Sequence, residues 1–487
     1  MKSSEMPQFE QELQLWINKE KAAIELSNVV GHLWLDKSIE LMLFRRPLFD
    51  VSITEILNDH LFAKKYVKES NLDVFLTLKL AKALSEIEIA PSRIDIGRLA
   101  KEFIEEKADE KDIDLFLKTK LKNHLGHESF ELKPKDVVLY GFGRIGRIAA
   151  RILIGNAGKG EQLRLRAIVT RTNSDEDIIK RASLLRKDSI HGKFGGTIIE
   201  DLENKALIIN GHIVKMIAAN SPAEINYNDY GIKSALLIDN TGVWRDREGL
   251  SAHLKSTGID KILLTAPGKG DVPNIVHGIN HQEFDISKER IYSAASCTTN
   301  AIVPVLKVTD DAFGIEDGHI ETVHAYTNDQ NLLDNFHKKF RRGRSAPLNM
   351  VITETGAASA VTKILPELDG KLTANAVRVP VPNASLAILH LGFSKKVTVE
   401  EVNETLKRAA LEGNLAEQID FSISTEMVSS DIVGNPHALI VDSKATLVSK
   451  DGKKAVIYAW YDNEYGYTRQ VIRLSKYLSG VRRLRYY

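Results

Sequence analysis

The chain contains a single cysteine, Cys297, among its 487 residues. One thiol cannot form an intramolecular disulfide or a cysteine cluster around a metal, so we expect neither, and no metal site. No apolar run approaches the roughly 18 residues that a membrane-spanning helix needs, and Met1 to Pro7 lacks the apolar stretch of a signal peptide. We therefore expect a cytoplasmic protein without a membrane partner, in which any thiol chemistry belongs to Cys297.

An excess of charge of one sign is also lacking. Lys and Arg number 66 and Asp and Glu 65, so no global field favours nucleic acid, and anions must be bound locally. Residues 1–134 are slightly acidic, with 20 basic and 24 acidic side chains. The small Arg45-Arg46 cluster fits a solvated helix end better than a phosphate contact, although the contact stays open. With 43% hydrophobic and 27% charged residues, the composition is that of a folded globular protein.

Glycine is scarce in residues 1–134, which hold three of the 31. Apolar residues recur there at helical spacing, and capping-box patterns at Ser52 to Glu55 and Ser92 to Asp95 predict helix starts. The predicted buried stripes are Leu26, Val29, Val30 and Leu33, and Ile96, Leu99, Ala100 and Phe103. We expect an all-α N-terminal region, joined to the rest by the polar segment from His127 to Asp136.

Short β-branched runs alternate with helical patterns after this join. The runs are Val137 to Tyr140, Leu165 to Val169, Ala235 to Ile238 and Ile262 to Thr265. Such alternation predicts an α/β fold with parallel strands joined by crossover helices.

A glycine-rich turn follows the first of these runs directly. Its residues are Gly141, Phe142, Gly143, Arg144, Ile145 and Gly146, and a helical pattern from Arg147 to Leu153 comes next. In this order of strand, turn and helix, Gly141 permits the tight turn, Gly143 lets backbone N–H groups approach a pyrophosphate, and Gly146 lets helix and strand pack closely. We predict a dinucleotide site here rather than an ordinary turn.

The second strand of such a site commonly ends in an acidic residue that binds the adenosine ribose. Here the strand through Val169 ends in Thr170-Arg171. A guanidinium pairs with a 2′-phosphate that a carboxylate would repel, so Arg171 favours NADP, or the use of both NADP and NAD. The alternative is a solvent-facing arginine at a loop start.

Cys297 follows small residues and precedes the apolar run Ala301 to Leu306, a pattern that suggests a helix N-terminus. A cysteine there would have its thiolate stabilised by unsatisfied N–H groups and the helix dipole. A buried structural cysteine is the alternative, and the local sequence does not decide between the two.

Five further motifs follow the glycine turn along the chain: Ser296 to Asn300, His324 to Gln330, Thr355 to Ala358, Arg378 to Pro380 and Trp460 to Glu464. With the glycine turn, they make the chain from about Lys135 onward resemble phosphorylating glyceraldehyde-3-phosphate dehydrogenases of the bacterial type. They occur in the family's order, and Cys297 and His324 have the family's separation. Residues 1–134 lie outside the resemblance.

The resemblance implies a Rossmann NAD(P)-binding domain at residues 135–296, completed by residues 463–487. An α+β catalytic domain with an antiparallel sheet would occupy residues 297–462, and residues 1–134 would be a helical extension. The implied reaction is the reversible phosphorylating oxidation of glyceraldehyde 3-phosphate with NADP or NAD, used in glycolysis or, with NADPH, in gluconeogenesis. A cytoplasmic homotetramer is the implied assembly.

The resemblance also assigns roles to residues. Cys297 would attack the aldehyde to give a hemithioacetal and then a thioester, with His324 as the general base and ion-pair partner that lowers the thiol pKa. Cofactor contacts would extend from the glycine turn to Arg171, Thr241, Gly242 and the nicotinamide-holding Asn463. Substrate phosphate would lie near Thr327, Asp329 and Arg378, and inorganic phosphate near Ser296, Thr298, Thr355 and Gly356. As a carboxylate, Asp329 could help only by accepting from a hydroxyl or by orienting Arg378.

The chain departs from the family at several positions. Arg171 replaces a common aspartate, Asn335-Phe336 stand where NAD-specific members usually have leucine and proline, and Ala301 replaces a frequent second cysteine. Arg341 to Arg344 falls in a loop that, in relatives, lies at the tetramer interface and near the cofactor; its other interpretation is a solvated basic loop.

Two other functions stay open. One is erythrose-4-phosphate dehydrogenase, although Thr355-Gly356 and Val379 to Pro382 look more like the triose enzyme. The other is a dehydrogenase-fold binding or regulatory protein that acts through residues 1–134 on a partner. We expect this extension to be a regulatory or assembly module.

Overall fold

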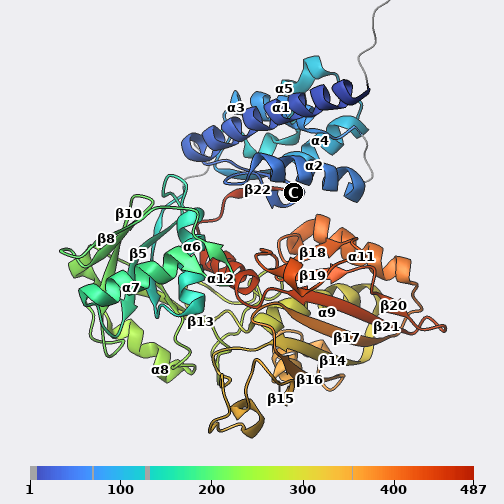
Figure 1. Cartoon of the computed structure of the whole chain (residues 1–487). Coiled ribbons are helices and arrows are strands. Elements are labelled where there is room, and N and C mark those ends of the chain that lie inside the picture. Colours follow the sequence, from blue (N-terminus) through green and yellow to red (C-terminus); the bar gives the residue numbers. More distant parts are fainter. Residues whose placement is uncertain (1–7, 68–70, 127–131, 354) are drawn as a thin grey trace, which may run out of the picture. The chain divides into compact units, whose positions relative to one another are not determined.

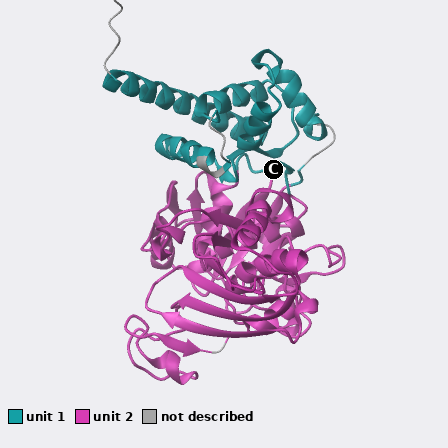
Figure 2. Ribbon diagram, turned by 90° about the vertical axis from the view of Figure 1, so that its right-hand side faces the viewer, with its two compact units in different colours: residues 1–133, 158–161, 482–487 teal, residues 134–157, 162–481 magenta. Residues whose placement is uncertain are grey.

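The computed structural model describes residues 8–67, 71–126, 132–353 and 355–487, and the chain forms two compact units (Figure 2). Unit 1 consists of residues 1–133, 158–161 and 482–487, and unit 2 of residues 134–157 and 162–481. Met1 to Pro7 and the first five residues of the polar join lie outside the described residues. The last six residues of the chain thus belong to unit 1, whereas the resemblance placed them in the nucleotide-binding domain.

Unit 1 is mainly helical, and both predicted apolar stripes lie in its core (Figure 1). Leu26, Val30 and Leu33 are buried, Val29 is partly buried, and the second stripe is buried throughout. The helices are α1 (Gln8–Lys37), α2 (Ile53–Val67), α3 (Val74–Ser85), α4 (Ile96–Glu105) and α5 (Ile113–Lys120). No helix in the described part of the chain is long and apolar enough to cross a bilayer.

One predicted helix start in unit 1 is confirmed and the other is wrong. Ser52 and Glu55 form a reciprocal capping box, with Glu55 N–H donating to the Ser52 hydroxyl at 3.2 Å and Ser52 N–H donating to the Glu55 carboxylate at 2.8 Å. Ser92–Asp95 is instead the strand β3, and α4 begins after it with Asp95 as its N-cap. The Asp95 carboxylate also accepts from the backbone N–H groups of Phe44 and Arg45, a tertiary contact that local spacing does not reveal.

A four-stranded sheet accompanies these helices, so the expectation of an all-α region is corrected. Its order is β2 (Arg46–Pro47), β1 (Glu40–Leu43), β3 (Ser92–Asp95) and β22 (Leu484–Tyr486). β22 lies parallel to β3 and comes from the other end of the chain. Strands of two to four residues are too short to show a periodicity, and a partner almost 400 residues away leaves no trace in local sequence.

The C-terminal tail also makes side-chain contacts within unit 1. Arg483 is buried, donates from Nε to the Ser38 carbonyl at 2.9 Å, and places its guanidinium 4.4 Å from the centre of the Trp34 ring. The Tyr486 hydroxyl donates to the Glu102 carboxylate at 2.5 Å. Unit 1 is therefore completed by the tail.

In unit 2, the first eight-stranded sheet forms the nucleotide-binding half. Its order is β13 (Ile291–Ser293), β12 (Ile259–Leu264), β11 (Ala235–Asp239), β4 (Lys135–Tyr140), β5 (Leu163–Thr170), β10 (His212–Ala218), β9 (Ala206–Ile209) and β8 (Ile198–Asp201). The first six strands are parallel, as the α/β alternation predicts, and β10, β9 and β8 pair antiparallel.

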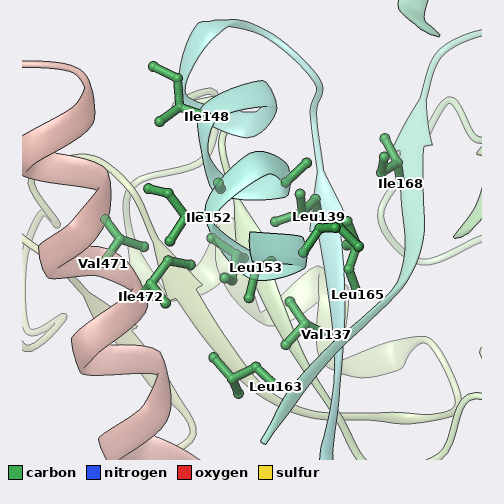
Figure 3. Packing of buried hydrophobic residues seen from close by; sticks show 14 of the residues in the cluster. Val137, Leu139, Ile148, Ile152, Leu153, Leu163, Leu165, Ile168, Val471 and Ile472 are labelled. Carbon is green, nitrogen blue, oxygen red and sulfur yellow. The ribbon is translucent and has the colours of Figure 1, made fainter. Parts of the chain in front are cut away.

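Both faces of this sheet are buried, because successive side chains of β4 point to opposite sides. Val137 and Leu139 join a core with the helices α6 (Arg144–Gly155), α7 (Asp175–Arg186) and α12 (Tyr465–Leu478), while Val138 and Tyr140 join a second core. Figure 3 shows Ile152 of α6 and Val471 of α12 meeting over the sheet. The packing fixes α6 directly after the glycine turn.

The second eight-stranded sheet carries the catalytic half. Its path is β15 (Val351–Thr353), β16 (Leu372–Val379), β14 (Ile315–Ala325), β17 (Ser385–Phe393), β21 (Lys454–Tyr461), β19 (Leu439–Asp442) and β18 (Ile419–Ser422), with β20 (Leu447–Val448) paired to β21. The sheet is mixed rather than purely antiparallel, since β14 pairs with β16 and β18 with β19 in parallel. The remaining elements of unit 2 are α8 (Arg247–Ser251), α9 (Cys297–Phe313), α10 (Ala357–Thr362), α11 (Val399–Leu411), β6 (Lys187–Asp188) and β7 (Gly192–Lys193).

Candidate active site

The glycine turn joins β4 to α6, and each glycine has a different environment. Gly141 has φ +92°, a conformation that favours glycine. A Cβ on Gly146 would lie 2.4 Å from the Gly141 carbonyl oxygen, so only glycine allows this close packing. A Cβ on Gly143 would meet no atom within 4 Å, and Gly143 is the N-cap of α6. The turn thus leaves open space where the helix N-terminus presents its N–H groups, which suits a pyrophosphate.

The other side chains of the turn point elsewhere. Phe142 is buried in the core of the nucleotide-binding half, and Ile145 packs against this core. Arg144 donates to both carboxylate oxygens of Asp188, at 2.9 and 3.1 Å, and to Glu464 at 2.5 Å. These three residues can therefore offer a cofactor only their backbone, and Arg144 ties the turn to the start of α12.

Arg171 follows the end of β5 and is exposed. None of the described residues forms a hydrogen bond or ion pair with its guanidinium. The charge is therefore available to an anionic ligand at the strand end.

Thr241 and Gly242 follow β11, the parallel neighbour of β4. The Asp239 carboxylate accepts from both the N–H and the hydroxyl of Thr241 at 2.7 Å, and Gly242 has φ +62°. A Cβ on Gly141 would lie 2.9 Å from the Thr241 methyl group, so the two turns touch at the carboxyl ends of adjacent strands. This edge is where parallel α/β sheets bind ligands.

Cys297 is the first residue of α9, as its sequence context suggested. Ser296 is the N-cap, and its hydroxyl accepts from Thr299 N–H at 3.0 Å. The Asn300 amide donates to the carbonyls of Ala294 and Ser296 at 2.8 and 2.9 Å. These bonds hold the half-buried thiol rigidly at the helix start.

His324, near the end of β14, faces the thiol. Its Nε2 lies 3.5 Å from Cys297 Sγ, and its Nδ1 lies 2.7 Å from the Ala325 carbonyl oxygen. The Arg378 guanidinium, which can only donate, also lies 3.0 Å from Nδ1. In the tautomer whose Nδ1–H donates to the carbonyl, Nε2 presents its lone pair to the thiol. Arg378 lies on β16, directly opposite His324 on the parallel strand β14, and donates to the same carbonyl at 2.9 Å.

The pKa directions at Cys297 and His324 differ from those of the thiolate–imidazolium pair that the resemblance implies. Burial raises the pKa of Cys297 above its ordinary value, against smaller opposing effects of Arg378 and Thr298. Burial, with the Arg378 charge, lowers the pKa of His324 to about 3. Loss of hydration therefore favours the neutral form of each of the two groups.

A cavity of about 470 Å³ opens over the thiol and is strongly cationic. None of the described residues that line it is a carboxylate. The charged side chains that line it are Arg245, Lys339, Arg342, Lys363 and Arg378. Such a lining suits a ligand with several negative charges.

Five of the seven predicted phosphate residues line this cavity and two do not. Those that do are Ser296, Thr298, Thr355, Gly356 and Arg378, whereas Thr327 and Asp329 are outside the lining. The Asp329 carboxylate was expected to accept from a hydroxyl or to orient Arg378, but it accepts a short hydrogen bond from Arg342. Asp329 thus positions the Arg342 guanidinium, which also donates to the Thr353 hydroxyl at 3.0 Å.

Asn463 is buried just after β21. Its side-chain oxygen accepts from the Ser385 hydroxyl at 3.0 Å, and that hydroxyl accepts from Ala325 N–H at 3.1 Å. The amide nitrogen of Asn463 is thereby oriented as a donor, with its carbonyl held beside the strand that carries His324.

Sequence reasoning missed several residues of this site. Tyr461 is buried with its hydroxyl 3.0 Å from the Thr298 hydroxyl, although the motif around it was noted. Arg342 belongs to a basic run that was assigned to a loop. Lys339, Lys363 and Arg245 carried no local sign, since surface lysines and arginines are common in any soluble chain.

Comparisons with known proteins agree with this geometry. Residues 135–247 match the family described as "Glyceraldehyde 3-phosphate dehydrogenase, NAD binding domain", and residues 296–463 match "Glyceraldehyde 3-phosphate dehydrogenase, C-terminal domain". Glyceraldehyde-3-phosphate dehydrogenase 2 of Bacillus subtilis (strain 168) is 39% identical over 344 residues, 71% of this chain and 96% of the relative.

A second relative also covers the N-terminal region. A "glyceraldehyde-3-phosphate dehydrogenase-like protein" of Pseudomonas aeruginosa (strain UCBPP-PA14) is 51% identical over 455 residues, 93% of this chain and 98% of the relative. This stretch is longer than the part of the chain that follows Pro134, so the similarity extends into residues 1–134.

Proposed function

The chain belongs to the glyceraldehyde-3-phosphate dehydrogenase family of oxidoreductases, and we propose that it oxidises glyceraldehyde 3-phosphate with inorganic phosphate to 1,3-bisphosphoglycerate, reducing NAD or NADP. The nucleotide-binding domain of this family takes a nicotinamide dinucleotide. The observation that carries the proposal is the Cys297 thiol 3.5 Å from His324 Nε2 at the floor of a cationic cavity.

Cys297 is the nucleophile of this reaction. Its sulfur attacks the aldehyde carbon, and His324 Nε2 takes the thiol proton and passes it to the former aldehyde oxygen. This gives a hemithioacetal and leaves His324 neutral again. The Cys297 backbone N–H, at the start of α9, stabilises the negative oxygen of the tetrahedral state. When bound, the cofactor supplies a nicotinamide ring that accepts the hydride from the former aldehyde carbon, and a thioester remains.

His324 acts twice more in the reaction, once before the thioester forms and once after phosphate cleaves it. As a neutral base it takes the hydroxyl proton of the hemithioacetal, and its low pKa keeps it unprotonated at the start of each cycle. Inorganic phosphate then attacks the thioester carbon, and the C–S bond breaks. The acyl phosphate is released, and the Cys297 thiolate takes back a proton from His324. A neutral pair avoids separating buried charges before substrate binds.

Two phosphates need ligands in the cavity. Arg378 and Arg342 bind one of them, with Asp329 positioning Arg342 and Thr327 lying nearby in sequence. The inorganic phosphate is bound by hydroxyl and N–H groups of Ser296, Thr298, Thr355 and Gly356.

Neighbouring arginines offer a matched test of this assignment. Arg342 lines the cavity and Arg341 does not. Arg342→Leu should raise the KM for glyceraldehyde 3-phosphate or phosphate at least about tenfold, because a charge-assisted hydrogen bond is lost. Arg341→Leu should change neither KM by more than about twofold. Equal effects of the two substitutions would contradict the assignment.

Cofactor choice is proposed from the end of β5. The free, exposed Arg171 guanidinium can pair with a 2′-phosphate, so the enzyme uses NADP as well as NAD. Arg171→Asp should lower kcat/KM for NADP at least about tenfold and leave NAD unchanged or improved. Loss of both activities together would argue against this role.

A homotetramer is proposed from an exposed apolar segment of unit 2. Residues 332–352 carry several large apolar side chains that are mostly exposed. Because a contiguous exposed apolar surface is unfavourable in water, we expect another copy of the chain to cover these side chains. These are Leu332, Leu333, Phe336, Phe340, Leu348 and Met350. The mass of the full-length protein in solution tests this directly, and a monomer at all concentrations would refute it.

The central experiment follows NAD and NADP reduction by the full-length protein with glyceraldehyde 3-phosphate, with and without inorganic phosphate. We expect phosphate-dependent turnover that Cys297→Ser abolishes. Erythrose 4-phosphate serves as the competing substrate, and a higher kcat/KM for it would replace the triose assignment. If neither aldehyde is oxidised under conditions where a known relative is active, the proposed function is wrong.

A further inference from the structure

The first four turns of α1 lack support from the rest of unit 1. Figure 2 shows them projecting away from the other helices of that unit. Of the residues from Gln8 to Lys21, none is buried, and burial in α1 begins only at Ala22. A helix of this kind normally keeps an apolar face only where another surface covers it.

The projecting turns nevertheless carry an apolar stripe. Phe9 is 72% exposed, Leu13 45% and Trp16 43%, and their spacing of four and three residues places them on one side of the helix. Leu15, 41% exposed, lies about 200° round the helix from Leu13 and is outside this stripe. An exposed tryptophan flanked by leucine and phenylalanine is typical of the centre of a protein interface.

Charges beside the stripe specify what covers it. Glu12 and Lys19 are seven residues apart and therefore lie on the same edge of the stripe. Neither forms an ion pair with another described residue. When two such helices pack antiparallel, the same edges face each other, so Glu12 of each copy meets Lys19 of the other. In a parallel pair, each residue would lie level with its own copy and this match would be lost.

The same antiparallel register also matches the apolar residues. It places Leu13 of one copy against Trp16 of the other, twice about a two-fold axis, and Phe9 against the methylene groups of Glu20. A sequence that is complementary to itself in both charge and size is the mark of an isologous contact.

We infer that residues 8–21 of α1 form an antiparallel helix pair with the same segment of a second copy of this chain. The contact lies outside the catalytic unit and does not depend on the proposed reaction. A pair of four-turn helices is smaller than a standard interface, so the association is concentration-dependent rather than permanent.

Sedimentation velocity of the full-length protein between about 1 and 100 µM tests this contact. In the Leu13→Glu variant, the mass should no longer grow with concentration, or the concentration of half-association should rise at least about tenfold. The reason is that the substitution buries a carboxylate against the apolar Trp16 side chain of the other copy, twice in each pair. The matched control Leu15→Glu should behave as the wild type. Equal masses of wild type and Leu13→Glu at every concentration, or an equal loss with Leu15→Glu, would overturn the inference.

Charge reversal tests the register. Glu12→Lys and Lys19→Glu, each alone, should weaken the association by opposing like charges, and the double variant should restore it. Failure of the double variant to recover, with unchanged helix content by circular dichroism, would overturn the antiparallel arrangement. Both readouts concern mass, so they stay separate from any failure of catalysis.

Discussion

Removing the last six residues should unfold unit 1 while leaving unit 2 folded. The deletion of Arg482 to Tyr487 takes away β22 and the buried Arg483, but keeps Val481, which belongs to a core of unit 2. The two units should therefore respond differently to a change at one end of the chain.

The size of the effect follows from the contacts of two residues. The Tyr486 hydroxyl bond to the Glu102 carboxylate contributes about 1.5–3 kcal/mol, and the Arg98 guanidinium over the Tyr486 ring about 0.5–1 kcal/mol. Loss of Arg483 uncovers Trp34, a large buried side chain, for about 1.5–3 kcal/mol more. The sum of about 3.5–7 kcal/mol is comparable with the whole stability of many domains.

Hydrogen exchange followed by mass spectrometry reads out each unit separately. In the deletion variant, peptides from β3 and α4 should lose protection by orders of magnitude, while peptides from β4 and β14 should not change. Deletion of Tyr487 alone is the control, since it removes cation–π contacts but no strand residue. Unchanged protection of β3 would refute the conclusion that the tail completes unit 1.

Three further predictions concern unit 2. Gly146→Ala puts a Cβ 2.4 Å from the Gly141 oxygen, so it should lower the free energy of unfolding by about 1–3 kcal/mol and weaken cofactor binding. In the control Gly155→Ala, the new Cβ meets no atom within 4 Å, so the substitution should be neutral or stabilising. Denaturant titration measures the stability of each variant, and cofactor titration measures its binding. Because the pKa of His324 falls from 6.5 to about 3 on folding, the unfolded chain binds a proton that the folded one does not, so the free energy of unfolding should decrease as pH falls from 6.5 by up to about 1.4 kcal/mol per unit. His324→Asn should lose this slope, and parallel profiles for the two proteins would contradict the assignment. Because burial raises the pKa of Cys297, alkylation by iodoacetamide without substrate should be slow at pH 7 and accelerate above pH 9, and full reactivity at pH 6 would show an ion pair instead.

Local sequence was sufficient where a feature depends on neighbouring residues. The order of strand, glycine turn and helix from Lys135 to Gly155 was readable because each glycine answers a backbone requirement within six residues. The helix start at Ser52 was readable for the same reason, since a capping box spans only four residues.

Contacts between distant segments were not readable in this way. Ser92 to Asp95 has the spacing of a capping box, but pairing with β1 and β22 makes it a strand. Asp329 was expected to accept from a hydroxyl or to orient Arg378, yet the loop that carries Arg342 brings that guanidinium to the carboxylate. In both cases several partners satisfy the same local pattern, and only the fold selects one.

By itself, the sequence determined the family and the α/β class and predicted a nucleophile and its base, because five motifs in a fixed order constrain chemistry more tightly than any single spacing. Only the tertiary structure gave the direction of the pKa shifts of Cys297 and His324, the cationic lining of the cavity and the role of the C-terminal tail in unit 1. These properties depend on burial and on charges brought together from remote segments. The hydration of a side chain and its distances from remote charges cannot be derived from the order of residues along the chain.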